Sequence, residues 1–113
     1  MVATITRQQL QEEMAAGSVV VLDALGGSYY EQQHLPGALP LVEDEVEAEA
    51  PRLVPDRSTP IVTYCSNPAC ANSTRVAQRL EQLGYTDVRK YAEGIADWVE
   101  AGLPVETGRA VHA

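Results

Sequence analysis

The stretch Ile61-Val62-Thr63-Tyr64-Cys65-Ser66-Asn67-Pro68-Ala69-Cys70-Ala71-Asn72-Ser73 joins a short β-branched run, through a cysteine, to a segment of small polar residues. Beyond it, apolar residues recur at helical spacing as far as Leu83, and Gly84 can end a helix in a left-handed conformation. The pattern predicts a strand, a loop and a helix. Such a loop lies at the carboxyl end of a strand and the amino end of a helix, where unpaired backbone N–H groups favour an anion.

Cys65 is the candidate nucleophile of this loop. Backbone donors of this kind stabilise a thiolate over a thiol and lower the pKa of a cysteine from its free value of about 8.5. The alternative is an inert buried cysteine, which the polar residues after it disfavour. Cys70 is either a second thiol that resolves an oxidised or persulfidated Cys65 as a disulfide, or a small side chain that fills the loop. The sequence leaves both interpretations of Cys70 open.

Four further stretches accompany the cysteine loop in a fixed order. They are Val19-Val20-Val21-Leu22-Asp23; His34-Leu35-Pro36-Gly37-Ala38; Gly84-Tyr85-Thr86-Asp87-Val88; and Gly94-Ile95-Ala96-Asp97-Trp98 with Ala101-Gly102-Leu103-Pro104-Val105. Together the five stretches resemble a single rhodanese domain and span most of residues 5 to 105. The resemblance implies an α/β fold, with a small parallel sheet of four or five strands and helices on both faces.

The resemblance also implies a sulfurtransferase that needs no cofactor. Cys65 is expected to take sulfur from thiosulfate or another small donor, hold it as a persulfide, and pass it to a thiol or cyanide. The active-site loop implied by the family comprises Ser66, Asn67, Pro68, Ala69, Cys70, Ala71, Asn72 and Ser73.

The loop departs from the usual family pattern in length and charge. Gly84 lies further from Cys65 than is usual, and Asn72-Ser73 stand where Arg-Ser is common. Residues 66–72 contain no Lys or Arg, so the nearest cation is Arg75, a candidate supporting residue. Asp23 is a second supporting candidate, expected mainly to hydrogen-bond loop N–H groups.

Other cysteine chemistries fit the spacing less well. A Cys-x5-Arg phosphatase needs an arginine where this chain has Ala71, and thioredoxin-type chemistry needs Cys-x-x-Cys. A zinc site would require both cysteines, His34 and His112 to converge from three regions, so no metal is expected. Two alternatives to sulfur transfer remain. One is a Cys65/Cys70 dithiol redox switch, and the other is an inactive rhodanese-like module that binds a protein.

Bulk composition limits the partners. The chain has 113 residues and a formal charge of −8, which argues against nucleic acid and anionic membranes.

We expect one domain over residues 1–113, with a core from about 5 to 105 and a loose tail at 106–113. With no apolar run long enough for a membrane span and no export signal, a cytoplasmic protein is predicted. The acidic segment 43–50, between Pro40 and Pro51, is either a solvated helix face or a docking surface for a protein partner.

Two capping boxes predict helix starts. Thr6-Arg7-Gln8-Gln9 predicts a helix over residues 7–16 that ends at Gly17, and Ser28-Tyr29-Tyr30-Glu31 predicts a second, short helix. Near the end of the chain, residues 87–91 are expected to form a strand. Residues 95–101 are expected to form a helix with Trp98 as its core anchor, and His34 is expected to serve a structural turn.

Overall fold

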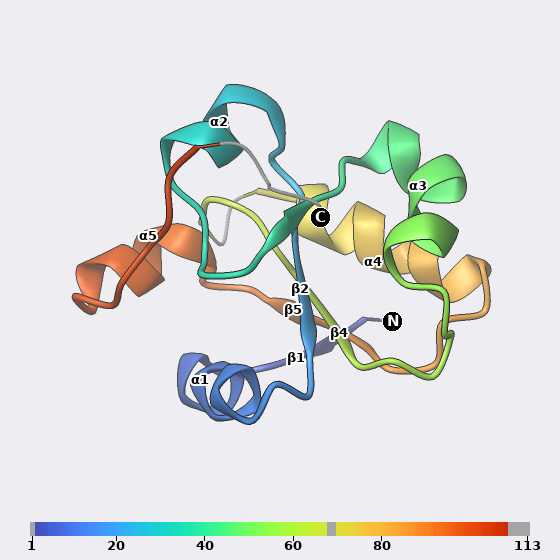
Figure 1. The fold of residues 1–113 in the computed structure, drawn as a ribbon, viewed down its shortest axis with the longest axis horizontal. Helices are drawn as coiled ribbons and strands as arrows, with labels where there is room; N and C mark the ends of the chain where they lie inside the picture. The colour runs from blue at the N-terminus through green and yellow to red at the C-terminus, as the bar shows by residue number, and fades with distance from the viewer. Residues whose placement is uncertain (1, 68–69, 109–113) are drawn as a thin grey trace.

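The computed structural model describes residues 2–67 and 70–108, and its centre is a five-stranded parallel sheet (Figure 1). The strands lie in the order β1-β5-β4-β2-β3. The predicted α/β architecture of four or five parallel strands is confirmed. In chain order the elements are β1 (Ala3–Thr4), α1 (Arg7–Ala16), β2 (Val20–Asp23), α2 (Gly27–Gln32), β3 (Leu39–Pro40), the 3-10 helix η1 (Glu43–Glu45), α3 (Val46–Leu53), β4 (Ile61–Tyr64), α4 (Asn72–Gln82), β5 (Val88–Tyr91) and α5 (Gly94–Glu100).

Helices cover both faces of the sheet, as predicted. On one face α3 and α4 bury Val46, Ala50, Val76 and Leu80 against the strands. On the other face α1, α2 and α5 contribute Leu10, Tyr30, Ile95 and Trp98 to a second core cluster. Figure 1 shows these two groups of helices on opposite sides of the strands. The sheet is therefore buried between two layers, as is usual for parallel strands joined by helical crossovers.

The strand register aligns the carboxyl ends of the three central strands. Asp23 at the end of β2 pairs with Tyr64 at the end of β4, and Tyr64 pairs with Tyr91 at the end of β5. Cys65 follows Tyr64 directly, so the candidate nucleophile emerges at the middle of this edge. Open α/β sheets place their functional groups at this edge.

The first capping box is confirmed and the second is wrong. Thr6 Oγ1 accepts from Gln9 N at 3.1 Å, the Gln9 side chain accepts from Thr6 N at 3.2 Å, and Gly17 closes α1 in the left-handed region. By contrast, α2 begins at Gly27, after Gly26, without a side-chain cap. Gly26 has a φ of +63°, and a Cβ there would lie 2.4 Å from Val42 Cγ1. This close approach fixes the turn at Gly26 and starts the helix before Ser28 can cap it.

The acidic segment forms η1 and the start of α3, and the helix continues through Pro51 instead of ending before it. Val54 N donates to Ala50 O at 2.8 Å, which closes the last turn beyond the proline. Val54 is buried with the α3 and α4 core, and Leu53 packs against it. This burial offsets the backbone hydrogen bond that Pro51 cannot donate.

Residues 106–108 do not form the loose tail expected from the sequence. Glu106 and His34 exchange backbone hydrogen bonds at 2.9 and 2.8 Å, and Gly108 N donates to Glu31 O at 2.7 Å. Glu106 Oε1 also accepts from Gly37 N at 2.8 Å. This segment is thus tied to the turn after α2, whereas His112 lies outside the described residues. Within the described ranges, none of the helices combines the length and apolarity that a membrane crossing requires.

Candidate functional site

Cys65 lies at the carboxyl end of the central strand and is only 2% exposed. Tyr64 points into the core formed with α1, α2 and α5. Because side chains alternate along a strand, Thr63 and Cys65 lie on the opposite side, toward α4. The sulfur of Cys65 is therefore carried to the side of the sheet where α4 begins.

The start of α5 holds the backbone of the cysteine loop. Ile95 N donates to Cys65 O at 2.9 Å, and Ala96 N donates to Ser66 O at 2.9 Å. Gly94 makes this approach feasible, because a Cβ at that position would lie 2.7 Å from both carbonyl oxygens. This role of Gly94 was not predicted from the sequence. Its only signal was the glycine that opens the Gly94-Ile95-Ala96-Asp97-Trp98 stretch.

Two side-chain hydrogen bonds from the sheet hold the start of α4 in place. Thr63 Oγ1 donates to Ser73 O at 2.9 Å, and Lys90 Nζ of β5 donates to Thr74 Oγ1 at 2.7 Å. Ala71, the N-cap residue of α4, makes no side-chain cap, and the first turn contains no acidic residue. An anion at this end of α4 therefore faces helix N–H groups with no carboxylate in the first turn of the helix. Lys90 was not predicted, because only the strand pairing brings residues 74 and 90 together.

The structure brings the two cysteines together as a disulfide between Cys65 and Cys70. Their Cα atoms are 6.3 Å apart, within the range of natural disulfides. Cys70 N also donates to Asn67 O at 3.1 Å. Pro68 and Ala69, two of the expected loop residues, lie outside the described residues. The structure therefore shows the oxidised form of Cys65 and Cys70, the two cysteines of the predicted loop.

Arg75 lies on the exposed face of α4 and, among the described residues, has no ion-pair partner. Its backbone N donates to Ala71 O at 3.1 Å in the first turn of the helix. Lys90 is half-buried beside the same turn. Arg75 and Lys90 are thus the cations at the first turn of α4, and a supporting role for Arg75 at Cys65 stays a prediction.

Asp23 is buried and binds the loop that follows β2. Its carboxylate accepts from Leu25 N at 2.7 Å, from Gly26 N at 3.3 Å and from Tyr64 Oη at 2.7 Å. Burial raises the pKa of Asp23, and the hydrogen bonds from Tyr64 and the two N–H groups oppose this shift. Burial next to Asp23 also raises the pKa of Tyr64. Asp23 thus supports the loop after β2 through hydrogen bonds, on a strand adjacent to the one that carries Cys65.

His34 occupies a buried turn after α2. Its ring stacks on Tyr30 with centroids 3.9 Å apart, and Nδ1 lies 2.8 Å from Tyr30 O. Both of its backbone groups bond to Glu106. In the part of the chain that the structure describes, His, Cys, Asp and Glu side chains do not gather in threes to form a metal site.

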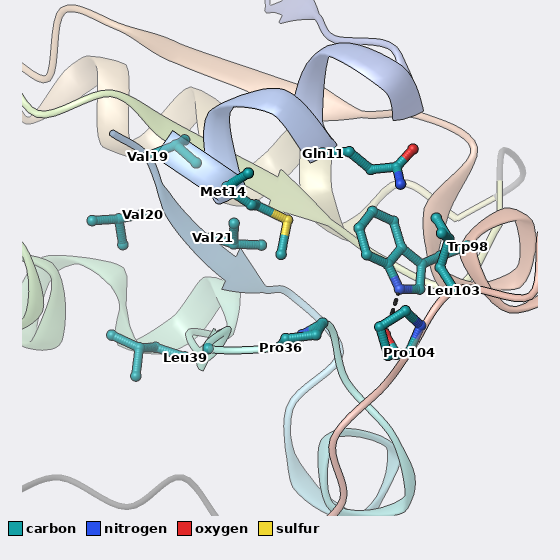
Figure 2. A pocket seen from close by; sticks show the side chains of 12 residues that line it. Gln11, Met14, Val19, Val20, Val21, Pro36, Leu39, Trp98, Leu103 and Pro104 are labelled. Carbon is teal, nitrogen blue, oxygen red and sulfur yellow. Dashed lines mark hydrogen bonds between the residues drawn. The ribbon is translucent and has the colours of Figure 1, made fainter. Parts of the chain in front are cut away.

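A separate apolar pocket of about 540 Å³ lies between α1, β2 and the segment after α5 (Figure 2). Met14, Val21 and Leu103 line it, together with Trp98, whose Nε1 donates to Pro104 O at 2.8 Å. Cys65 is not among its lining residues. The pocket and the cysteine loop are therefore two distinct features of the molecule.

The fold and the position of the cysteine define a rhodanese-type domain, and sequence comparison supports the same class. Residues 6–101 match the Rhodanese-like domain family. The chain belongs to that family.

The chain is similar to a transcriptional regulator and to solved structures of a sulfurtransferase and a rhodanese. HTH-type transcriptional regulator Rv0324 of Mycobacterium tuberculosis is 31% identical over 107 residues, covering 95% of this chain and 46% of the regulator. The chain thus spans about half the length of that curated relative. A thiosulfate sulfurtransferase of Pseudomonas aeruginosa has a TM-score of 0.80 at 22% identity, covering 98% of this chain and 22% of that chain. A structure described as rhodanese with anions from E. coli has a TM-score of 0.66 at 27% identity, covering 80% and 99% of the two chains.

Proposed function

We propose that this domain is a sulfurtransferase whose Cys65 carries sulfane sulfur as a persulfide. The position of Cys65 supports the proposal most directly. It lies at the end of β4, its carbonyl is held by α5, and its side chain lies on the side of the sheet where α4 begins. Helix N–H groups at such a place stabilise a thiolate and, after sulfur uptake, a persulfide anion.

The working form is the reduced one, in which Cys65 is a thiolate. This thiolate attacks the outer sulfur of a donor such as thiosulfate, the S–S bond of the donor breaks, and sulfite leaves with the electron pair. The sulfur then remains on Cys65 as a persulfide. A thiolate or cyanide attacks that outer sulfur next, and the Cys65 thiolate leaves. The steps require no metal or organic cofactor.

Mass spectrometry of the loaded protein tests the proposal. The reduced protein is treated with thiosulfate or with polysulfide, freed of excess reagent, and analysed both intact and as the peptide that contains both cysteines. We expect one added sulfur atom on Cys65, which cyanide removes and which Cys65→Ser abolishes. Failure of both donors to add sulfur to the wild-type protein, with its thiols shown to be free, would falsify the proposal.

A second candidate function is favoured by the disulfide itself. In this case the Cys65/Cys70 pair is a dithiol switch, and the domain acts by binding a protein partner, for example through the acidic surface of η1 and α3. The relation to a transcriptional regulator fits this role. Cys70→Ser separates the candidates, because sulfur transfer through Cys65 survives this change and a dithiol switch does not. An inactive binding module would retain its partner in Cys65→Ser. The cytoplasmic location also remains a prediction.

A further inference from the structure

The two sulfur atoms of the loop disulfide have different surroundings. Cys65 is 2% exposed, and its carbonyl is fixed by Ile95 N at 2.9 Å. Cys70 is only partly buried, and Asn67 and Ala71 on either side of it are exposed. Cys65 therefore lies at the floor of the loop, and Cys70 lies at its rim.

We propose that an external thiol opens this disulfide at Cys70, so that Cys65 is the leaving thiolate. The inference rests on the proposed function in one respect, because it takes the Cys65 thiolate as the form that must be regenerated. It identifies Cys70 as the residue that receives the reductant. The reductant belongs to the class of low-molecular-weight thiols.

Access determines which sulfur is attacked. Thiol–disulfide exchange requires the incoming thiolate to approach one sulfur in line with the S–S bond, on the side away from the leaving sulfur. An approach to Cys65 is obstructed, because this residue is only 2% exposed and its carbonyl is held by the start of α5. An approach to Cys70 comes from the side where Asn67 and Ala71 are exposed.

The leaving-group chemistry favours the same direction. Exchange is faster when the departing thiol has the lower pKa. Cys65 departs toward the start of α4, where Ala71 makes no side-chain cap and the first turn carries no acid. The carbonyl that Ile95 holds also keeps Cys65 in this place after the bond breaks. Cys70 carries the adduct on the more exposed part of the loop.

Reduction of the disulfide takes two exchange steps. An external thiolate attacks the Cys70 sulfur, a new S–S bond joins the external thiol to Cys70, and the old bond breaks with its electron pair on Cys65. A second external thiolate then attacks the external sulfur of this mixed disulfide. The external disulfide leaves, and Cys70 takes up a proton as a thiol. Two thiols are oxidised and one protein disulfide is reduced.

Trapping the mixed disulfide tests the inference. The oxidised full chain is mixed briefly with glutathione, quenched with N-ethylmaleimide, and digested with trypsin to release the peptide from Ser58 to Arg75. Fragment masses are expected to place glutathione on Cys70 and maleimide on Cys65. Glutathione mainly on Cys65, or equally on both residues, would overturn the inference.

A second measurement determines the outcome if the adduct reacts on too quickly to be trapped. In the fully reduced protein, the rates at which iodoacetamide alkylates each cysteine are followed from about pH 5 to about pH 9. Cys65 is expected to show the lower pKa, and a lower pKa for Cys70 would overturn the inference. Neither measurement uses a sulfur donor. A failure of the proposed sulfur transfer therefore gives a different result from a failure of this inference.

Discussion

The carbonyl oxygen of Cys65 lies 2.7 Å from the position that a Cβ atom on Gly94 would occupy. Two backbone hydrogen bonds from α5 to the loop depend on this approach. Gly94 also has a φ of +74°, so a side chain there is strained even without the contact.

Gly94→Ala should therefore lower the free energy of unfolding by about 2–4 kcal/mol, from left-handed strain plus displaced loop carbonyls. The same change should slow sulfur loading of Cys65. Gly102→Ala is the matched control, because Gly102 has a φ of +77° and nothing lies within 4 Å of its added Cβ. Urea unfolding of both variants should show a larger loss for Gly94→Ala. An equal loss of stability in the two variants would show that the contact between Gly94 and the loop does not contribute to the free energy of unfolding.

Tyr91→Phe should make the protein less stable near neutral pH than in acid, relative to the wild type. The hydrogen bond from Tyr91, together with Arg7, holds the pKa of Asp97 below its usual value of 3.8. A carboxylate with a lowered pKa adds stability above its ordinary pKa and loses it as the pH falls through the folded-state value. Without the hydroxyl, we expect a deficit of about 1–2 kcal/mol at pH 7 that narrows toward pH 3.5.

Urea midpoints across this pH range measure the effect on Asp97. Tyr29→Phe, at an exposed position, is the control and should follow the wild type throughout. A Tyr91→Phe deficit that does not change with pH would show that the hydroxyl acts only by packing.

Removing residues 106–113 should destabilise the protein by about 2–4 kcal/mol. The truncation deletes the two backbone hydrogen bonds between Glu106 and His34 and the bond from Gly37 N to the Glu106 carboxylate. Removing only residues 109–113 keeps these contacts and is the control. Thermal unfolding should separate the two truncations, and equal melting temperatures would argue against a structural role for Glu106.

Arg75→Gln should slow reduction of the loop disulfide by glutathione about two- to threefold, because a surface charge contributes a few tenths of a kcal/mol to an ionic encounter. Reduction by 2-mercaptoethanol, whose attacking thiolate carries a single negative charge and no carboxylate, should slow less, since Arg75 also attracts the carboxylates of glutathione. Arg52→Gln removes the same charge from α3 and controls for net charge. If both thiols slow equally in Arg75→Gln, the side chain acts through the loop structure and not through charge.

Local chemistry made much of the fold predictable. Thr6 and Gln9 form a reciprocal cap between neighbours in sequence, and the apolar run that ends at Asp23 becomes β2. The second capping box was wrong because Gly26 is fixed by Val42, a contact that sequence spacing does not reveal.

The site was predictable as a location but not as a set of contacts. Cys65 and Cys70 could be assigned to one loop because a strand, polar residues and a helix follow in order. The contacts of Gly94 with the Cys65 carbonyl and of Lys90 with Thr74 depend on strand pairing and crossover. Such contacts between distant segments leave no periodic pattern in the sequence.

Trp98 gives the molecule an intrinsic optical probe. It is the single tryptophan of the chain, it is 3% exposed, and it lies in the same helix whose first N–H groups hold Cys65 and Ser66. Its ring meets Tyr91 edge to face at 6.4 Å. When tryptophan is excited selectively, the emission therefore comes from α5, the helix that holds the backbone of the cysteine loop. The emission spectrum can report changes in the surroundings of Trp98 in real time, without an attached dye, while the thiols are oxidised, reduced or loaded with sulfur.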